Sequence, residues 1–337
     1  MRKFLKYCLL FAIPFLVLLG CYIWFDPFKV VWHYDNYYVK GDGGSLNRNY
    51  VSTMNYLNKY EQYHYDSFIF GNSRSLCYRI DDWKKYIPQQ SSCYHFSESG
   101  GSINGIYYKL RMIDEKGEKI KNALLVVDYS LLRHLEQDGR PFVMPPVLNH
   151  YRNAFTFHAE HFAQWMDLRF LYYWTKYEVT GKFTPRMGGF LARGRNYQYY
   201  NPVTNEEPRL WEDSLIAAGN YYTPQRIKGF KGKQKGGTTE EYLNDTEKCD
   251  RLMDIRQLFD KHHTDYRIII SPLYDQMKFN NNDLQVLYRI FGQDHVYDFS
   301  GVSEWTSDYH NYYEWSHYLP SIANMIMAQV YHKKLQE

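Results

Sequence analysis

Residues 65–75 read YDSFIFGNSRS, and this stretch decides the expected fold. Its apolar part predicts a strand over 65–70, because such runs are typical of strands buried on both faces of a parallel sheet. Gly71 allows a tight turn, so Asn72 and Ser73 follow at the carboxyl end of the strand. In open α/β sheets this is the edge where sites form. The stretch therefore predicts a buried strand that presents a serine hydroxyl at a sheet edge.

Segments of the same kind recur along the chain, and they alternate between strand and helix patterns. Further strands are expected over 93–96, 124–127, 266–270 and 296–299, and helices over 102–116, 238–263, 281–291 and 318–335. This alternation predicts an α/β fold with a doubly wound, mainly parallel sheet in a three-layer, flavodoxin-like arrangement.

Residues 129–237 interrupt the alternation. They include Pro145 and Pro146 and hold many of the Tyr and Trp residues of the chain. We interpret this region as a large inserted cap or lid over the site. The α/β domain is then expected to consist of 65–128 and 238–337.

The N-terminus has the pattern of a membrane anchor. Residues 1–6 carry three positive charges, and the nineteen residues of 7–25 carry none. That length is enough for a helix to cross a bilayer, and positive charge before the span places the N-terminus in the cytoplasm. We therefore expect an anchor over 1–25, a Tyr- and Asn-rich juxtamembrane segment over 26–64, and an extracytoplasmic (periplasmic) remainder on a bacterial cell membrane.

Two other interpretations of the N-terminus remain. Residues 18–21 read LLGC, which resembles a lipobox with Cys21 as the lipidated residue. A cleaved signal peptide is the other, but no small-residue cleavage site follows the apolar run. The run continues through Phe25, which favours an uncleaved single-pass anchor over the lipoprotein alternative.

Composition excludes several classes of protein. The 337 residues are 45% hydrophobic and 23% charged, which is typical of a folded chain. A net charge of +3 is too weak to indicate a nucleic-acid partner. The 35 tyrosines suit a glycan-facing or membrane-facing surface, and equally a polar, Tyr-rich core.

The five cysteines give no metal-binding or redox motif. Cys8 and Cys21 lie in the N-terminal apolar run, and Cys77, Cys93 and Cys249 lie outside it without CxxC spacing. At most one disulfide is expected among the latter three, and pairing of Cys77 with Cys93 stays open. Neither a metal nor a cofactor is expected.

Two short segments carry the candidate chemistry. Ser73 follows a strand and a glycine, so its hydroxyl can act as a nucleophile, although a serine in this position is often only a helix cap. Residues 314–317 read EWSH, with Glu314 three residues before His317. This spacing places both side chains on one side of a helical turn, so one segment supplies a base and the carboxylate that orients it.

The combination of the two segments resembles the SGNH/GDSL hydrolase superfamily. The first block of that family is Gly-Asp-Ser or a relaxed form of it, and residues 71–73 read GNS. The last block is Asp-x-x-His, close to EWSH here. Residues 311–320, NYYEWSHYLP, look like the membrane-anchored branch that includes proteins of alginate O-acetylation and teichoic-acid D-alanylation.

The resemblance implies a role for each matching residue. Ser73 would be the nucleophile, His317 the general base and Glu314 the group that orients it. The second block of the family contributes a glycine amide to the oxyanion hole, matched here by Gly100 or Gly101, and the amide of Ser73 would be the other donor.

The sequence departs from the family pattern in two places. Glu314 stands where the family has Asp. The third block, Gly-x-Asn-Asp, is missing, and VVDY stands in its place at 126–129. One oxyanion donor is therefore lost, and Asn104 or Ser130 is the candidate replacement. Asp128 either matches the Asp of that block or caps a strand.

Arg74 directly follows the candidate nucleophile. It either holds an anionic or sugar substrate or forms an internal salt bridge. We expect Arg74 and Asp128 to be the substrate-binding residues.

These observations favour an enzyme that transfers or hydrolyses acyl esters on a cell-envelope polysaccharide or other glycan. The alternative is a catalytically degenerate binding or assembly subunit that partners a membrane-bound O-acyltransferase. The altered third block supports the alternative, and the Ser-His-Glu pattern supports the enzyme.

Overall fold

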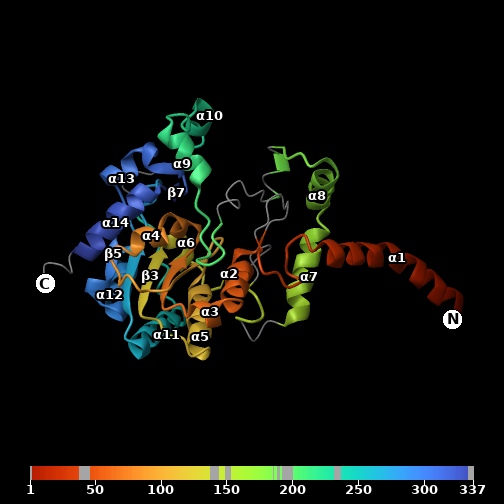
Figure 1. The fold of residues 1–337 in the computed structure, drawn as a ribbon, viewed down its shortest axis with the longest axis horizontal. Coiled ribbons are helices and arrows are strands. Elements are labelled where there is room, and N and C mark those ends of the chain that lie inside the picture. The colour runs from red at the N-terminus through yellow and green to blue at the C-terminus, as the bar shows by residue number, and fades with distance from the viewer. Residues whose placement is uncertain are drawn as a thin grey trace. The chain divides into compact units, whose positions relative to one another are not determined.

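The computed structural model of the chain describes residues 2–37, 46–136, 144–148, 153–184, 186–187, 190–191, 200–230 and 237–332 (Figure 1). The chain forms two compact units. The first contains Met1–Val51 and Asp138–Gln198, and the second contains Ser52–Gln137 and Tyr199–Glu337.

The second unit is built on a parallel sheet. Its strands are β1 (Ser67–Gly71), β2 (Cys93–Ser97), β3 (Asn122–Val127), β4 (Asp265–Ile270) and β5 (Val296–Asp298). The strand order is β2-β1-β3-β4-β5, and every neighbouring pair is parallel. The prediction of an α/β fold with a mainly parallel sheet is confirmed.

The described residues of the two units also form helices. They are α1 (Arg2–Phe25), α2 (Arg48–Leu57), α3 (Tyr60–Tyr63), α4 (Ile80–Trp83), α5 (Ile103–Glu115), α6 (Tyr129–Leu132), α7 (Ala154–Trp165), α8 (Leu168–Thr180), α9 (Leu210–Ala217), α10 (Pro224–Ile227), α11 (Thr246–His262), α12 (Asn281–Phe291), α13 (Glu304–Ser307) and α14 (Pro320–His332). Short 3₁₀ helices are η1 (Ser73–Cys77), η4 (Gln293–His295) and η5 (Tyr309–Asn311), and a small hairpin is formed by β6 (Tyr312–Glu314) and β7 (His317–Tyr318).

Alternate side chains of the central strands pack on opposite faces of the sheet. Leu124 and Val126 of β3 belong to a core cluster with residues of α4 and α14. Leu125 and Val127 instead lie with apolar residues of α5, α11 and α12. Helices α5 and α11 lie side by side on that face (Figure 1). The period of two along β3 thus gives each face its own apolar layer.

Gly71 is required by the packing of β1 against β3. It pairs with Val126, and a Cβ atom at this position would lie 2.5 Å from the Val126 carbonyl oxygen. No side chain fits in that space without moving the strand. The glycine that ends the apolar run is therefore a consequence of close backbone approach at the sheet edge.

One predicted helix begins later than expected. The helix over 238–263 starts only at Thr246, where the side chain of Asp245 accepts a hydrogen bond from the Glu247 amide. Before it, the amides of Tyr242 and Leu243 donate to the carboxylate of Asp283 on α12. The Asp283 carboxylate thus takes the place of helical hydrogen-bond partners for these amides. The predicted helix was wrong for its residues before Thr246.

The region 129–237 does not form one insertion. Residues 138–198 belong to the first unit and 199–237 to the second, apart from positions outside the described residues. In the first unit, α7 and α8 share a core with α1 and the segment after it, in which Phe28, Phe157 and Trp165 are buried.

The second part of this region covers the edge strand β2. The amide of His95 donates to the Thr204 carbonyl at 2.9 Å, and the Asn205 side chain donates to the His95 carbonyl at 2.8 Å. An exposed strand edge can pair with other chains, and these two bonds occupy the amide and the carbonyl of His95 on that edge. Residues 200–206 are thus part of the α/β unit.

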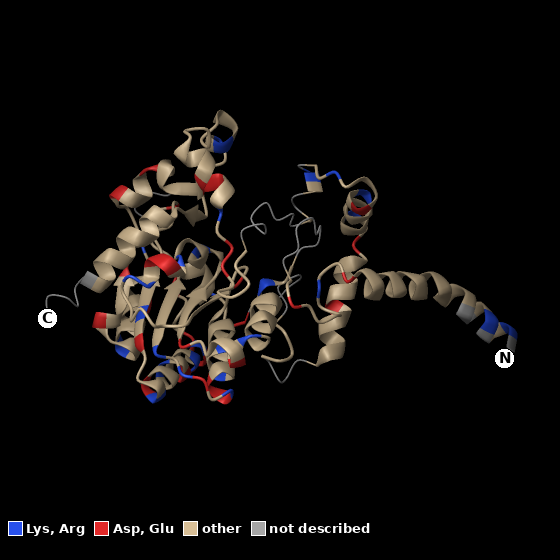
Figure 2. Cartoon of the chain, in the orientation of Figure 1, with Lys and Arg blue, Asp and Glu red and all other residues tan. Residues whose placement is uncertain are grey.

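Helix α1 covers 2–25 of the membrane anchor that was expected over 1–25. Basic residues lie near its N-terminal end and most of its length carries no charged residue (Figure 2). Phe11 and Trp24 are among its exposed apolar side chains. Nevertheless, within the described part of the chain no helix is both long enough and apolar enough to cross a membrane. The structure therefore gives no support to the predicted span.

The cysteines outside the N-terminal run are free thiols. Cys77 and Cys93 are buried, and Cys249 is partly buried. The thiol of Cys77 donates to the Arg74 carbonyl, and that of Cys93 contacts the Ser91 carbonyl. The Cys77–Cys93 disulfide that the sequence left open is therefore not formed.

Candidate active site

Ser73 is the first residue of the 3₁₀ helix that follows β1. The side chain of Asn72 caps this helix by accepting a hydrogen bond from the Arg74 amide at 3.0 Å. The amide of Ser75 donates to the Asn72 carbonyl at 2.9 Å. Asn72 and Ser75 are buried, whereas Ser73 is partly exposed. The turn therefore points one hydroxyl outward and holds its neighbours within the fold.

Glu314 and His317 face each other across the hairpin of β6 and β7. The two residues are paired in the antiparallel register, with Trp315 and Ser316 between them. The helical turn expected from their spacing was wrong. A two-residue hairpin loop also brings residues i and i+3 together, so the same spacing serves in a different structure.

His317 connects the hairpin to the nucleophile turn. Its Nε2 lies 2.7 Å from Ser73 Oγ, and its Nδ1 is hydrogen-bonded to the carboxylate of Glu314. The tautomer with its proton on Nδ1 fits both contacts, because Nδ1–H then donates to Glu314 and Nε2 accepts from the Ser73 hydroxyl. The three residues thus have the mutual arrangement of a serine–histidine–acid triad.

Glu314 is itself held in place by the hairpin turn. Its second carboxylate oxygen accepts a hydrogen bond from the Ser316 amide at 2.8 Å. With one oxygen on the imidazole and the other on the backbone, the carboxylate has a fixed orientation. The longer side chain of Glu, compared with Asp, spans the hairpin without loss of contact.

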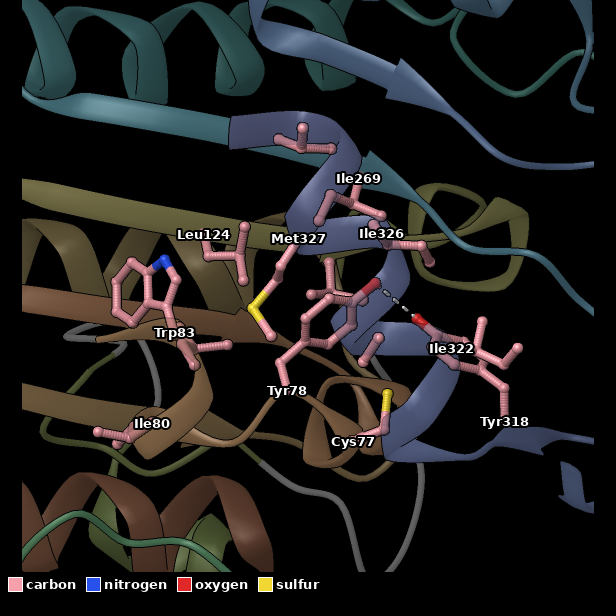
Figure 3. Packing of buried hydrophobic residues seen from close by; sticks show 14 of the residues in the cluster. Cys77, Tyr78, Ile80, Trp83, Leu124, Ile269, Tyr318, Ile322, Ile326 and Met327 are labelled. Atoms are coloured by element: carbon pink, nitrogen blue, oxygen red, sulfur yellow. Dashed lines mark hydrogen bonds between the residues drawn. The ribbon is translucent and has the colours of Figure 1, made fainter. Parts of the chain in front are cut away.

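A buried cluster of aromatic and aliphatic side chains supports both segments of the triad. Figure 3 shows Cys77 and Tyr78, which follow the nucleophile, next to Tyr318, which follows His317. The Tyr318 hydroxyl donates to the Tyr78 hydroxyl at 3.2 Å. Residues of α14 such as Ile322 complete the cluster. Ser73 and His317 are therefore both attached to one buried core.

Arg74 joins three parts of the site. Its guanidinium forms an ion pair with Asp128 at 2.7 Å and donates to the Ser316 carbonyl at 3.1 Å and to Ser130 Oγ at 2.9 Å. The side chain is only 11% exposed. Arg74 thus connects the nucleophile turn, the end of β3 and the base hairpin.

Asp128 is the acceptor at the centre of this network. It caps α6, accepts hydrogen bonds from the Ser130 and Leu131 amides, and receives the side chains of Asn72 and Arg74. Burial alone would raise its pKa, but the charge of Arg74 and these hydrogen bonds hold the pKa below its usual value. Asp128 is an ionised internal anchor, and both predicted substrate-binding residues are engaged with each other.

The loop after β2 approaches the nucleophile turn closely. Gly100 and Gly101 have φ values of 86° and 75°, a region that favours glycine. A Cβ atom at Gly101 would lie 3.1 Å from the Asn72 Cβ. The glycine that matches the second block therefore lies against the residue preceding Ser73.

A buried ion pair underlies this loop. Lys109 of α5 contacts Glu98 at 2.5 Å, and both side chains are almost completely buried. Gly105 leaves room for the carboxylate, since a Cβ there would lie 2.4 Å from Glu98 Oε1. The sequence analysis did not identify this pair, because no spacing signal connects Glu98 with Lys109.

The two candidate substitutes for the missing oxyanion donor have other environments. The backbone amide of Asn104 donates to the Leu135 carbonyl, and the buried side-chain Oδ1 of Asn104 has no hydrogen-bond partner among the described residues. Ser130 Oγ donates to Asp128. In the part of the chain described, neither side chain is hydrogen-bonded to Ser73 or His317.

The environment of His317 keeps the imidazole neutral. Burial lowers its pKa below the usual 6.5, and the charge of Arg209 acts in the same direction, while the hydrogen bond to Glu314 opposes both. For Glu314, burial would raise the pKa, but the contact with His317 and the Ser316 amide bring it below its usual value. A neutral imidazole beside an ionised carboxylate is the pair that a general base requires.

A pocket opens beside the triad. Its walls contain Ser73, Arg74, Leu76, Cys77, Arg79, Arg209, Tyr313, His317, Tyr318 and Pro320. Arg209 comes from the region predicted to be a cap, and the sequence offered no signal for its place here. In the described residues no cluster of three His, Cys, Asp or Glu side chains is arranged to hold a metal ion.

Comparison with known proteins gives no assignment. No protein-family model matches the chain, and no curated protein matches it.

Proposed function

We propose that this protein is a serine-dependent esterase or acyltransferase of the SGNH type that acts on a cell-envelope glycan. The observation that carries the proposal is the 2.7 Å contact between Ser73 Oγ and His317 Nε2, with Glu314 on the other ring nitrogen. The proposed cycle needs a nucleophile, a base and an orienting acid, and these are the three groups in contact.

The proposed reaction has two half-reactions. Ser73 Oγ attacks the carbonyl carbon of an ester while His317 Nε2 takes the hydroxyl proton. The bond between the carbonyl carbon and the alcohol oxygen breaks, and the protonated His317 returns the proton to the leaving alcohol. The acyl group then remains on Ser73.

In the second half-reaction an acceptor attacks the acyl-enzyme. The acceptor is water or a sugar hydroxyl, and its oxygen bonds to the carbonyl carbon while His317 takes its proton. The bond to Ser73 Oγ breaks, and the proton passes to Ser73. Water as acceptor gives an esterase and a sugar hydroxyl gives a transferase.

The proposed oxyanion hole consists of backbone amides. Ser73 begins a 3₁₀ helix, and Gly101 lies against the nucleophile turn. Their amides are the candidate donors for the negative charge that develops on the carbonyl oxygen. A site with two donors instead of three is expected to be slower by about 10²–10³-fold.

The SGNH relationship rests on topology and on the triad. The order β2-β1-β3-β4-β5 is that of flavodoxin-like doubly wound sheets. The nucleophile follows β1, the first strand in sequence, and the base precedes the last helix. Both positions match the SGNH/GDSL pattern that the sequence resembles.

The glycan substrate and the membrane setting are proposals from the sequence. The charge-free run of 7–25 after a basic start is the support for membrane attachment, with a membrane-bound O-acyltransferase as candidate partner. Lipidation at Cys21 stays the alternative. Extraction of membranes at alkaline pH, followed by immunoblotting of the full chain, tests attachment, and recovery in the soluble fraction would contradict it.

A degenerate assembly subunit is the second candidate. The observation that favours it is the third block, where Asp128 and Arg74 pair with each other and no Asn donor is present. A subunit of this kind would keep its partner's acyl transfer after loss of Ser73.

Turnover of p-nitrophenyl acetate by the full chain separates the two candidates. Replacing Ser73 with Ala is expected to lower kcat/KM by on the order of 10⁴-fold or more, because the acyl-enzyme can no longer form. Ser321→Ala, at an exposed position of α14, is the matched control and should retain the wild-type rate. Equal turnover by the Ser73→Ala variant and the wild type would contradict the enzymatic proposal.

A further inference from the structure

Arg209 lies in the wall of the pocket that contains Ser73 and His317. It immediately precedes α9 and is partly buried. Its guanidinium lies over the ring of Tyr313 at 4.9 Å from the ring centroid. The planar group is thus held at a fixed place beside the triad, although no sequence motif marked it.

The other two arginines of the pocket have carboxylate partners. Arg74 pairs with Asp128, and Arg79 pairs with Asp213, which also accepts the Tyr313 hydroxyl. Among the residues that the structure describes, no carboxylate forms an ion pair with Arg209. Arg209 is therefore the arginine of this pocket without an ion-pair partner among the described residues, although its charge helps to lower the pKa of Glu314.

The position of Arg209 affects the chemistry of the base. The attack by Ser73 converts His317 into an imidazolium, and a nearby positive charge disfavours that form. Arg209 accordingly contributes to the lowered pKa of His317. A negative charge bound at Arg209 would remove this repulsion at the moment when the imidazolium forms. The pocket is thus better matched to an anionic substrate than to a neutral one.

We propose that Arg209 binds an oxyanion of the substrate, a carboxylate or a phosphate, and so selects acyl esters carried by acidic glycans. This inference rests on the proposed acyl chemistry at Ser73. Arginine presents a fork of N–H donors that matches either oxyanion in a two-point contact. Tyr313 supports the face of the guanidinium, whereas a two-point contact with an oxyanion uses its edge.

Matched esters test the proposal. Monoacetyl galacturonate and monoacetyl galactose differ only at C6, which is a carboxylate in the first and a hydroxymethyl group in the second, and acetyl glycerol phosphate supplies a phosphate. The wild type is expected to have a higher kcat/KM for at least one of the two anionic esters than for the neutral one. The better anionic ester identifies the oxyanion. Equal values for all three would overturn the proposal.

The Arg209→Gln variant should lose this preference. We expect its kcat/KM for the preferred anionic ester to fall about 10-fold or more, mainly through KM, since a charge-assisted contact is lost. Turnover of the neutral ester at pH 8 should not fall in this variant and should, if it changes, rise, because the imidazolium that forms during the attack no longer meets the Arg209 charge. Arg209→Lys, which keeps the charge but not the fork, should lie between the two.

Arg226 provides the matched control. It lies over the ring of Tyr221 at 4.0 Å but is not part of the pocket wall. Arg226→Gln should leave both the rate and the preference unchanged. A fall in the anionic and neutral rates by the same factor in Arg209→Gln would indicate a structural role and overturn the proposal.

A pH profile with the neutral ester gives an independent readout. Loss of the Arg209 charge should raise the pKa of His317, so the acid limb of kcat/KM moves to higher pH in Arg209→Gln. An unchanged limb would contradict the electrostatic part of the inference.

Binding measurements keep the inference separate from the catalytic proposal. Calorimetry with a galacturonate oligomer, a poly(glycerol phosphate) fragment and a neutral galactose oligomer requires no turnover. If no ester is hydrolysed but an anionic oligomer binds the wild type at least about 10-fold more tightly than Arg209→Gln, the acyl chemistry fails and the anion site stands. No difference between the two proteins overturns the anion site.

Discussion

The nucleophile turn and the base hairpin position the triad by different means. The turn of Ser73 belongs to the sheet, and a buried charge network centred on Asp128 holds it. The hairpin of Glu314 and His317 lies outside the five-stranded sheet, and it is held mainly by its own Tyr318, which is buried in the core cluster, with one contact from Arg74 to the Ser316 carbonyl. We therefore expect changes in the charge network around the turn, Ser73 apart, mainly to reduce stability, and changes at Glu314 and His317 mainly to reduce rate.

After the loss of Ser73 itself, the largest effect is expected from the acid of the hairpin. Glu314→Gln keeps the size of the side chain but favours the other tautomer of His317, so kcat should fall by about 10³–10⁴-fold. The free energy of unfolding, measured by urea denaturation, should change little, because Glu314 is 38% exposed. A loss of stability without a loss of rate would reverse the expected roles of the two regions.

The next effect is expected from the charge network of the turn. Asp128→Ala leaves Arg74 as a buried cation without its partner, which should lower the free energy of unfolding by about 3–5 kcal/mol. Urea denaturation measures this loss. The double variant Arg74→Met/Asp128→Ala is the control, and it should recover part of the loss. If the double variant lost as much free energy of unfolding as the two single changes together, Arg74 and Asp128 would not stabilise each other, and the network would not act as described.

The pH dependence of the rate is expected to report His317. The imidazole acts as a base only when neutral, so activity should be lost as the pH falls through its pKa, which burial holds below 6.5. We expect the acid limb of kcat/KM for p-nitrophenyl acetate below pH 6.5. A limb at or above that value would mean that the imidazole is not held as the structure indicates.

The smallest effect is expected from the tyrosine contact that joins the two regions. Tyr318→Phe removes the hydroxyl that bonds to Tyr78 and should cost about 1 kcal/mol of stability. Measured kcat should fall only a few-fold, because the ring still fills the core. Tyr331→Phe, which removes a buried hydroxyl bonded to Trp83 at a distance from the triad, should cost similar stability without the change in kcat. A large loss of rate in Tyr318→Phe alone would show that the hydroxyl itself fixes the base.

The sequence was sufficient for the sheet and for naming the candidate catalytic residues that the structure brings into contact, because both depend on local patterns. Short strand-length segments predicted the five strands of the parallel sheet, and a glycine before Ser73 predicted the turn. The spacing of Glu314 and His317 predicted their contact but not the hairpin, since residues i and i+3 meet in both structures. The local pattern therefore fixed the partners and left the backbone ambiguous.

The remaining features depend on contacts between distant segments. The region of 129–237 was expected to be one cap, yet its two parts join different units. Arg209 reaches the pocket only because the second part belongs to the α/β unit, and the pairing of Lys109 with Glu98 depends on how α5 packs on the loop after β2. No periodicity in a single sequence records such proximity.

The most direct test of the catalytic proposal is labelling by a fluorophosphonate probe followed by peptide mass spectrometry. Ser73 lies 2.7 Å from His317 Nε2, so the wild type should form a covalent adduct on Ser73, and the rate of labelling should fall sharply in His317→Ala. Labelling of Ser73 at the same rate in both proteins, or no adduct on Ser73 in the wild type, would contradict the account.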